Sequence, residues 1–273
     1  TCARHEDSVA AWKLRAQTEQ WAADTKTACE TLRAALDHVP AAEQRSLRLA
    51  LAALELDQGD HAAGLRELNT LAADDPNDAE VRQRLLDQPD VRRETARAQT
   101  LVDELRKIEG ERGTQWRFYQ AAVWMTSDHW RDHGGEVAEL LTACSAADPA
   151  WPAPVLLLGD LYQRQGDIAR LEALYRDFLQ RRPTAVAVAE RLVNVLEREG
   201  RFDEAQSVLA SLPEDSNLAG RDTLLALRSG DARKAIALLR ERLKSDPDDA
   251  GARVLLARLI YESTGDAQAA FAE

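Results

Sequence analysis

Residues 155–183 read VLLLGDLYQRQGDIARLEALYRDFLQRRP, and this stretch decides the fold. Its first half has apolar residues at helical spacing and ends at Gly166-Asp167, a dipeptide whose residue types favour a turn. The second half repeats the helical spacing and stops at Pro183, which cannot continue a helix. The stretch therefore predicts two antiparallel helices joined by a tight turn, an αα-hairpin.

The same pattern of turn residues recurs along the chain. Successive turn glycines at positions 166, 200, 230 and 265 are 34, 30 and 35 residues apart. A small residue, such as Ala205 or Ala235, stands five residues after the turn glycine, where two helices must approach closely. A period of about 34 residues indicates an array of helix pairs in which each pair contacts only its neighbours.

This pattern resembles that of tetratricopeptide repeat (TPR) proteins over essentially the whole chain. Gly159, Tyr162, Gly166 and Pro183 match the family's small residue, tyrosine, turn glycine and closing proline, whereas Leu171 replaces its usual alanine. The resemblance implies an all-α fold: a TPR-like, right-handed α-solenoid of about eight antiparallel helix pairs, forming one domain over residues 1–273.

The register divides the chain into eight expected hairpins. Pro89 makes the third irregular, and the fourth has a wide turn around 127–135. The eighth breaks off in its second helix at 269–271 without a polar cap, so we expect a longer natural chain and ends capable of self-association. The hairpins span roughly 8–40, 44–76, 78–109, 114–149, 152–183, 185–213, 216–247 and 249–273.

Charge and composition exclude several classes of partner. With 35 basic and 47 acidic residues, the net charge of −12 disfavours nucleic acid and anionic membranes. No apolar run reaches the length of about 20 residues that membrane insertion requires. Cys2, Cys29 and Cys144 are odd in number and have neither disulfide nor zinc spacing. Together with the lack of a signal segment, this favours a soluble, cytoplasmic protein, although the compartment is not identified.

The sequence offers no recognisable catalytic chemistry. It contains neither a phosphate-binding glycine loop nor a nucleophile motif such as GxSxG. His129 and His133 resemble a metal-ligand pair only weakly, because Gly134-Gly135 follows them and favours a structural turn. We therefore expect no enzyme activity, no catalytic residues, no metal and no cofactor.

Stacked repeats place equivalent residues side by side. Arg164, Arg198 and Arg228 lie two residues before a turn glycine, and Arg191 and Arg221 lie nine before it. In the TPR family the first helices line the concave surface, so the resemblance implies a basic stripe there, suited to an acidic segment or a terminal carboxylate. The alternative is that arginines in the last helical turn only bind free carbonyls. The candidate partner-binding residues are Arg191, Asn194, Arg198, Arg221 and Arg228.

A second candidate patch is aromatic. Trp116, Tyr119 and Trp130 fall in the hairpin with the wide turn, and tryptophan and tyrosine are common interface anchors. The alternative is that these rings fill the gap left by the irregular third hairpin.

These observations predict a protein–protein interaction scaffold or adaptor that binds a peptide or protein segment on the concave face of the first helices. The alternative is a structural spacer or self-association module within a larger multidomain protein. The carboxylate clamp of chaperone-binding TPR members is not reproduced, because Glu190 stands at a clamp lysine position.

Overall fold

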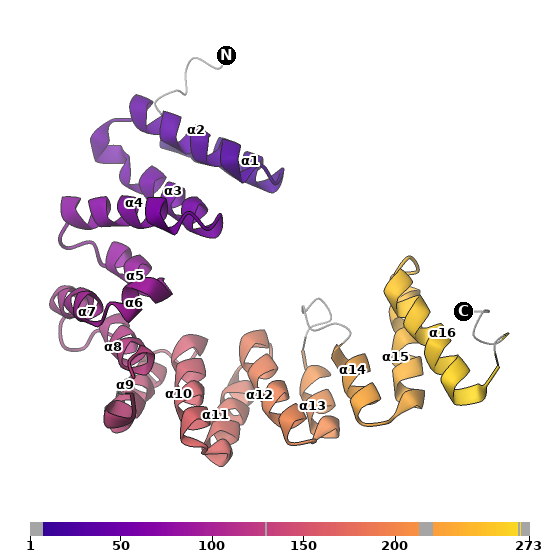
Figure 1. Cartoon of the computed structure of the whole chain (residues 1–273). Coiled ribbons are helices and arrows are strands. Elements are labelled where there is room, and N and C mark those ends of the chain that lie inside the picture. The colour runs from indigo at the N-terminus through magenta and orange to yellow at the C-terminus, as the bar shows by residue number, and fades with distance from the viewer. Residues whose placement is uncertain (1–7, 129, 213–220, 267, 269–273) are drawn as a thin grey trace. The chain divides into compact units, whose positions relative to one another are not determined.

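The computed structural model describes residues 8–128, 130–212, 221–266 and 268. Within these ranges the regular elements are helices and no strand occurs, which confirms the predicted all-α class. The chain forms two compact units, residues 1–140 and 141–273, and each is built from consecutive antiparallel helices (Figure 1). No helix in the described ranges is both long and apolar enough to span a bilayer.

The first unit begins with two regular hairpins, followed by an interrupted one. Pro89 starts a separate five-residue helix, so the third hairpin has a short first helix, an extra turn and a long second helix. The helices are α1 (Val9–Trp21), α2 (Thr25–His38), α3 (Arg45–Asp57), α4 (His61–Asp74), α5 (Ala79–Asp87), α6 (Pro89–Arg93), α7 (Thr95–Glu109) and α8 (Gln115–Thr126).

The second unit contains the more regular copies. Helix α9 (Gly134–Ala147) begins in the first unit and ends in the second, after the 3-10 turn η3 (Trp130–His133). The remaining helices are α10 (Pro152–Gln165), α11 (Ile168–Arg181), α12 (Val186–Arg198), α13 (Phe202–Leu209), α14 (Arg221–Arg228), α15 (Ala232–Ser245) and α16 (Ala250–Thr264). The segment 269–271, where the second helix of the eighth hairpin is expected to break off, lies outside the described residues.

A glycine turn joins the helices of the α3–α4, α10–α11, α12–α13 and α14–α15 hairpins. Gly166 and Gly230 have φ angles of 74° and 79°, a left-handed conformation that glycine adopts without steric cost. Where the following residue is an aspartate, it caps the next helix, as when Asp167 accepts a hydrogen bond from the Arg170 amide at 3.1 Å; Arg201, after Gly200, forms no such cap. The Gly-Asp dipeptide therefore ends one helix and starts the next, and Gly59-Asp60 repeats it in the first unit.

The hydrophobic core is a row of clusters, each shared by neighbouring helices. Within the first unit, one cluster joins α1, α2 and α3, and the next extends from α3 to α8. Within the second, one cluster runs from α10 to α14, and another covers α14, α15 and α16. Each helix thus depends on its neighbours to cover its apolar face, as expected for a repeat array.

Close helix contacts occur where the sequence has small residues. Ala205 and Ala235 are fully buried. A Cβ built on Gly64 would lie 2.6 Å from Leu56 Cγ and 2.9 Å from the Ala52 carbonyl oxygen, so only glycine fits between α3 and α4 there. The small residue five positions after the turn glycine therefore marks the contact between the helices of a hairpin.

Candidate partner-binding face

The first helices of the second unit are linked by a repeated polar contact. Arg191 of α12 donates to Asp160 of α10 at 3.4 Å, and Arg221 of α14 donates to Asn194 of α12. Asp160 and Asn194 each lie six residues before a turn glycine, and both arginines lie nine before theirs. The two contacts therefore occupy equivalent repeat positions. We call each contact a rung, and the series of contacts across α10, α12 and α14 the ladder.

Glu197 adds a second layer to this ladder. Its carboxylate binds Arg221 Nε at 3.1 Å and Arg228 at 2.8 Å, and Glu190 lies 3.6 Å from Arg221. The side chains of Arg221 and Glu197 are only 20% and 13% exposed. Acidic residues on α12 therefore offset the arginines of α14, so this part of the face carries mixed charge instead of the expected basic stripe.

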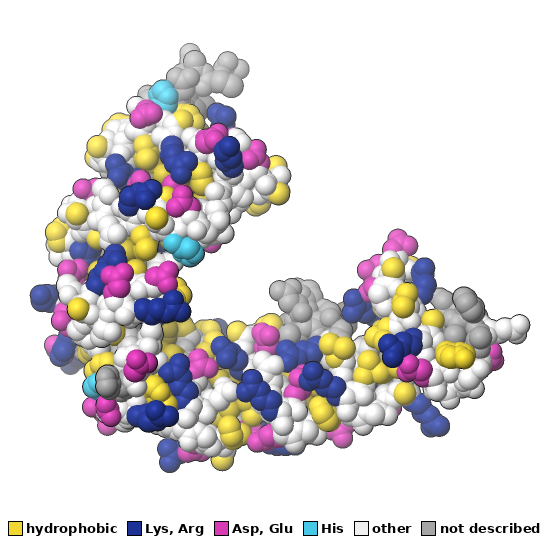
Figure 2. All heavy atoms as spheres, viewed as in Figure 1, with side chains coloured by type: hydrophobic (Ala, Val, Ile, Leu, Met, Phe, Trp, Pro, Cys, Tyr) yellow, Lys and Arg dark blue, Asp and Glu magenta, His cyan; other side chains and the backbone are white. Residues whose placement is uncertain are grey.

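Figure 2 shows the same distribution on the visible side of the second unit, where basic and acidic side chains are interspersed. Arg198 differs from the paired arginines. It is exposed, and among the described residues it has no hydrogen bond or ion pair. Arg191 is half-exposed, and Arg164 and Arg228 are exposed, so accessible guanidinium groups lie on α10, α12 and α14.

Asp160 lies in a partly dehydrated position beside the core of the hairpin. Burial raises the pKa of its carboxyl group, while the Arg191 and Arg164 guanidinium groups act in the opposite direction. Burial, together with the Asp160 carboxylate, also raises the pKa of Tyr175 to about 12. The Asp160–Arg191 pair therefore connects a carboxylate beside the buried Tyr175 with a half-exposed arginine at the surface.

The three predicted aromatic residues do not form a common exposed patch. Trp116 is buried, its Nε1 donates to the Gly110 carbonyl at 3.1 Å, and the Arg106 guanidinium lies 4.7 Å from its ring. Tyr119 is also buried and donates to Asp87 at 2.7 Å, as part of the core around the irregular third hairpin. Trp130 is partly exposed in η3 and stacks with the Arg131 guanidinium at 4.8 Å.

The histidine pair of the wide turn is only partly visible. His133 stacks on Trp124 with ring centroids 4.4 Å apart, and its Nδ1 lies 3.9 Å from Glu136. His129 and Cys2 lie outside the described residues. The described cysteines, Cys29 and Cys144, are buried and unbridged, and no group of three metal-binding side chains occurs in the described ranges.

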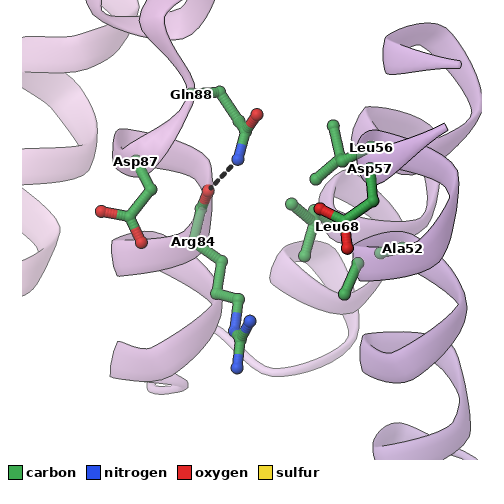
Figure 3. A pocket seen from close by; sticks show the side chains of 8 residues that line it. Ala52, Leu56, Asp57, Leu68, Arg84, Asp87 and Gln88 are labelled. Carbon is green, nitrogen blue, oxygen red and sulfur yellow. Dashed lines mark hydrogen bonds between the residues drawn. The ribbon is translucent and has the colours of Figure 1, made fainter. Parts of the chain in front are cut away.

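A pocket lies between α3 and α5 (Figure 3), and the sequence did not predict it. It depends on the spacing between two helices, which no local motif encodes. Its lining residues are Ala52, Ala53, Leu56, Asp57, Leu68, Arg84, Asp87 and Gln88.

Comparison with known proteins supports the fold. No family model matches the chain. Cellulose synthase operon protein C of Xanthomonas axonopodis pv. citri is 30% identical over an alignment of 161 residues, and the match covers 55% of this chain and 10% of that protein. The chain thus spans about a tenth of the length of this curated relative.

Two solved structures show the same architecture at low identity. A tetratricopeptide repeat protein from Parabacteroides merdae has a TM-score of 0.55 and 13% identity, with 92% of this chain and 98% of that chain covered. PilW, a widely conserved type IV pilus biogenesis factor, has a TM-score of 0.51 and 16% identity, with 78% of this chain and 99% of that chain covered. The predicted TPR-like fold is therefore confirmed.

Proposed function

We propose that this TPR-like solenoid is a non-enzymatic scaffold that binds an extended protein segment across α10, α12 and α14. The observation that carries the proposal is the repeated rung, Asp160–Arg191 followed by Asn194–Arg221. Equivalent polar groups at a regular interval suit an extended chain, whose own groups also recur at a regular interval.

The accessible groups of the ladder define what this segment must carry. Arg198 is exposed and has no partner among the described residues, so it is the preferred contact for an acidic side chain. Asn194 uses its side-chain oxygen on Arg221, which leaves its amide N–H groups for a carbonyl of the partner's main chain. We therefore propose a segment with one or two carboxylates and polar main-chain contacts.

Arg191 can take part because its own ion pair is weak. The side chains of Arg191 and Asp160 are 50% and 36% exposed, and exposed ion pairs contribute only about 0–1 kcal/mol. A carboxylate from the partner can replace Asp160 at small cost. Arg221, in contrast, lies in a less exposed network and serves mainly to hold α14 against α12.

We infer binding instead of catalysis because the polar groups are spread along three helices and paired with one another. A catalytic site requires a nucleophile, a base and stabilising donors that converge on one reacting atom.

A charge-reversal experiment tests this proposal. The double variant Arg191→Glu/Arg198→Glu changes two accessible residues of α12, and Arg170→Glu/Arg181→Glu makes the same charge change on the second helix α11. Partners captured by the wild type would be identified by mass spectrometry, purified and measured for direct binding. We expect the α12 variant to lose binding and the α11 variant to keep it, while both retain wild-type circular dichroism.

Equal binding by both variants, or equal loss in both, would contradict the assignment to α10, α12 and α14.

A second candidate function is a structural segment of a longer repeat array. The match to a tenth of a much longer relative favours it. Light scattering distinguishes the two functions: concentration-dependent association that an added capping helix abolishes supports the structural segment, whereas a stable monomer supports the scaffold.

A further inference from the structure

The pocket of the first unit has an apolar floor and a polar rim. It measures about 220 Å³ and is open to solvent. Ala52, Ala53 and Leu56 of α3, with Leu68 of α4, form the apolar part. Asp57 lies at one side, and Arg84, Asp87 and Gln88 line the other, as Figure 3 shows. The pocket therefore combines a surface for an aliphatic chain with groups for a polar end.

The carboxylates at this rim are not matched by free cations. Asp57 points from α3 toward α5, and among the described residues it has no hydrogen bond or ion pair. Asp87 accepts from the neutral Tyr119 hydroxyl at 2.7 Å. The only cation in the lining, Arg84, lies 3.3 Å from Glu80.

The pairing of Arg84 continues away from the pocket. Glu80 is also bound by Arg45 at 2.8 Å, and Arg45 in turn binds Asp78 at 2.5 Å. Glu80 thus offsets the charge of Arg84, which lines the pocket opposite Asp57. Asp57 has no ion pair among the described residues and lies beside apolar side chains.

We propose that this pocket binds a lysine or arginine side chain from a basic segment of a partner protein. The aliphatic stem packs on Ala53 and Leu56, and the cationic head binds Asp57. The volume is below the roughly 300–1,000 Å³ of small-molecule sites and suits one long side chain. The net charge of −12 also attracts a basic segment.

This site goes beyond the function proposed above. It lies in the other unit and selects the opposite charge, so the two sites can succeed or fail separately.

The test uses short peptides and the whole chain. Isotope-labelled protein would be titrated with acetyl-Ala-Lys-Ala-amide and followed by NMR. Two matched probes replace the lysine by norleucine, which keeps the stem without the charge, or by glutamate. We expect the lysine peptide to shift the amide signals of residues 52–57 and 84–88, with weaker binding at high salt, and the other two peptides to bind at least about fivefold more weakly.

Two variants make the assignment specific. Asp57→Asn removes the proposed acceptor, and because Asp57 is exposed and has no partner among the described residues, the variant should fold normally. We expect about fivefold weaker lysine-peptide binding in Asp57→Asn and unchanged binding in Asp74→Asn, an exposed site at the far end of α4.

Equal binding of the norleucine and lysine peptides would overturn the proposal in favour of an apolar cleft. It would also be overturned if Asp57→Asn bound the lysine peptide like the wild type, or if no signals in these two segments moved. The variant Arg191→Glu/Arg198→Glu leaves the pocket intact, so it should bind the lysine peptide normally. A failure of the pocket proposal can therefore be distinguished from a failure of the function proposed for the second unit.

Discussion

The hydroxyl oxygen of Tyr175 fills the space that a side chain on Gly159 would need. A Cβ built on Gly159 would lie 2.1 Å from this oxygen and 2.5 Å from Cζ of the same ring. Gly159 belongs to α10 and Tyr175 to α11, so the pair sets how closely the two helices of this hairpin approach. The tyrosine is almost fully buried, which leaves it little room to move aside.

Gly159→Ala should therefore lower the free energy of unfolding by about 1–3 kcal/mol through overpacking, despite the better helix propensity of alanine. Gly135→Ala is the matched control, because Gly135 is also helical and nothing lies within 4 Å of its built Cβ. Urea denaturation would measure both. Tyr175→Phe should restore part of the loss in the Gly159→Ala background, and a loss of equal size in Gly135→Ala would contradict the overlap.

Ala23 adopts the backbone conformation that the other turns give to glycine. Its φ of 60° lies in the left-handed region, and Asp24 then caps α2 by accepting from the Thr27 amide at 3.0 Å. We expect Ala23→Gly to raise the free energy of unfolding by about 0.5–1 kcal/mol, because glycine relieves the strain of Cβ.

Gly166→Ala should have the opposite effect. Nothing lies within 4 Å of its built Cβ, so only backbone strain would act. Thermal denaturation of both variants gives the comparison, and a destabilised Ala23→Gly would show that this turn is not left-handed in solution.

The helix-pair fold could be predicted because turn chemistry is local. Gly166-Asp167 specifies both the end of one helix and the start of the next, and the recurrence of the turn glycine sets the period. Ala23 could not be assigned in the same way, because nothing about an alanine signals a left-handed conformation. Its turn is set by the helices packed on either side.

The candidate face was less predictable because its properties depend on pairs of distant residues. The arginines of the second unit were expected to form a basic stripe, but Glu197 binds both Arg221 and Arg228 from the neighbouring helix. Trp116 and Tyr119 are buried in the core around the irregular third hairpin, which agrees with the alternative that these rings fill a gap there and not with an exposed patch. The sequence period predicts which residues occupy equivalent positions in successive repeats. It does not predict charge balance or burial, because both depend on the distances between helices.

Arg82 should be one of the most sensitive residues of the first unit. Its side chain is 3% exposed and pairs with Glu104 at 2.9 Å. It also donates to the carbonyl oxygens of Ala72, Asp75 and Asp78 around the end of α4. Removing the side chain breaks all of these contacts, after which the Asp75 and Asp78 carbonyls keep only the backbone amides of Asp78 and Arg82 as donors.

We expect Arg82→Ala to lower the free energy of unfolding by about 2–4 kcal/mol, because several hydrogen bonds from a buried guanidinium are lost. Arg93→Ala, which removes an exposed pair with Asp90, should cost at most about 1 kcal/mol. Chemical denaturation monitored by circular dichroism would check both values, and similar small effects would show that the Arg82 network contributes little.

Asp78 should make part of the stability pH-dependent. The Arg45 guanidinium lowers the pKa of this carboxyl below its ordinary value of 3.8. Because the pKa is lower in the folded state, the stabilisation is present above about pH 4 and is lost as the pH falls through the folded-state pKa. Asp78→Asn keeps a capping side chain but removes the charge, so it should be less stable than wild type at pH 7 by about 1–2 kcal/mol.

The difference between wild type and Asp78→Asn should shrink between pH 4 and pH 2. Thermal midpoints measured across this range would test it. A constant difference would place the pH dependence elsewhere among the carboxylates.

Arg221 and Arg191 occupy equivalent repeat positions but should respond differently to truncation. The Arg221 side chain is 20% exposed and bound to Glu197, whereas that of Arg191 is 50% exposed and bound to Asp160. Arg221→Ala leaves the poorly exposed Glu197 with Arg228 as its remaining partner, so we expect a loss of about 1–3 kcal/mol in the free energy of unfolding. Arg191→Ala should change it by at most about 1 kcal/mol.

The contrast between Arg221 and Arg191 distinguishes an effect on stability from an effect on partner binding at the same face. Arg221→Lys keeps the charge but cannot reproduce the forked contact, so its stability should lie between those of wild type and Arg221→Ala. If Arg191 contacts the partner, Arg191→Ala weakens binding with little change in urea stability, whereas Arg221→Ala weakens both together. An Arg221→Ala variant as stable as wild type would mean that the Arg221–Glu197 contact does not hold α14 in place, and Arg221 would then be as available to a partner as Arg191.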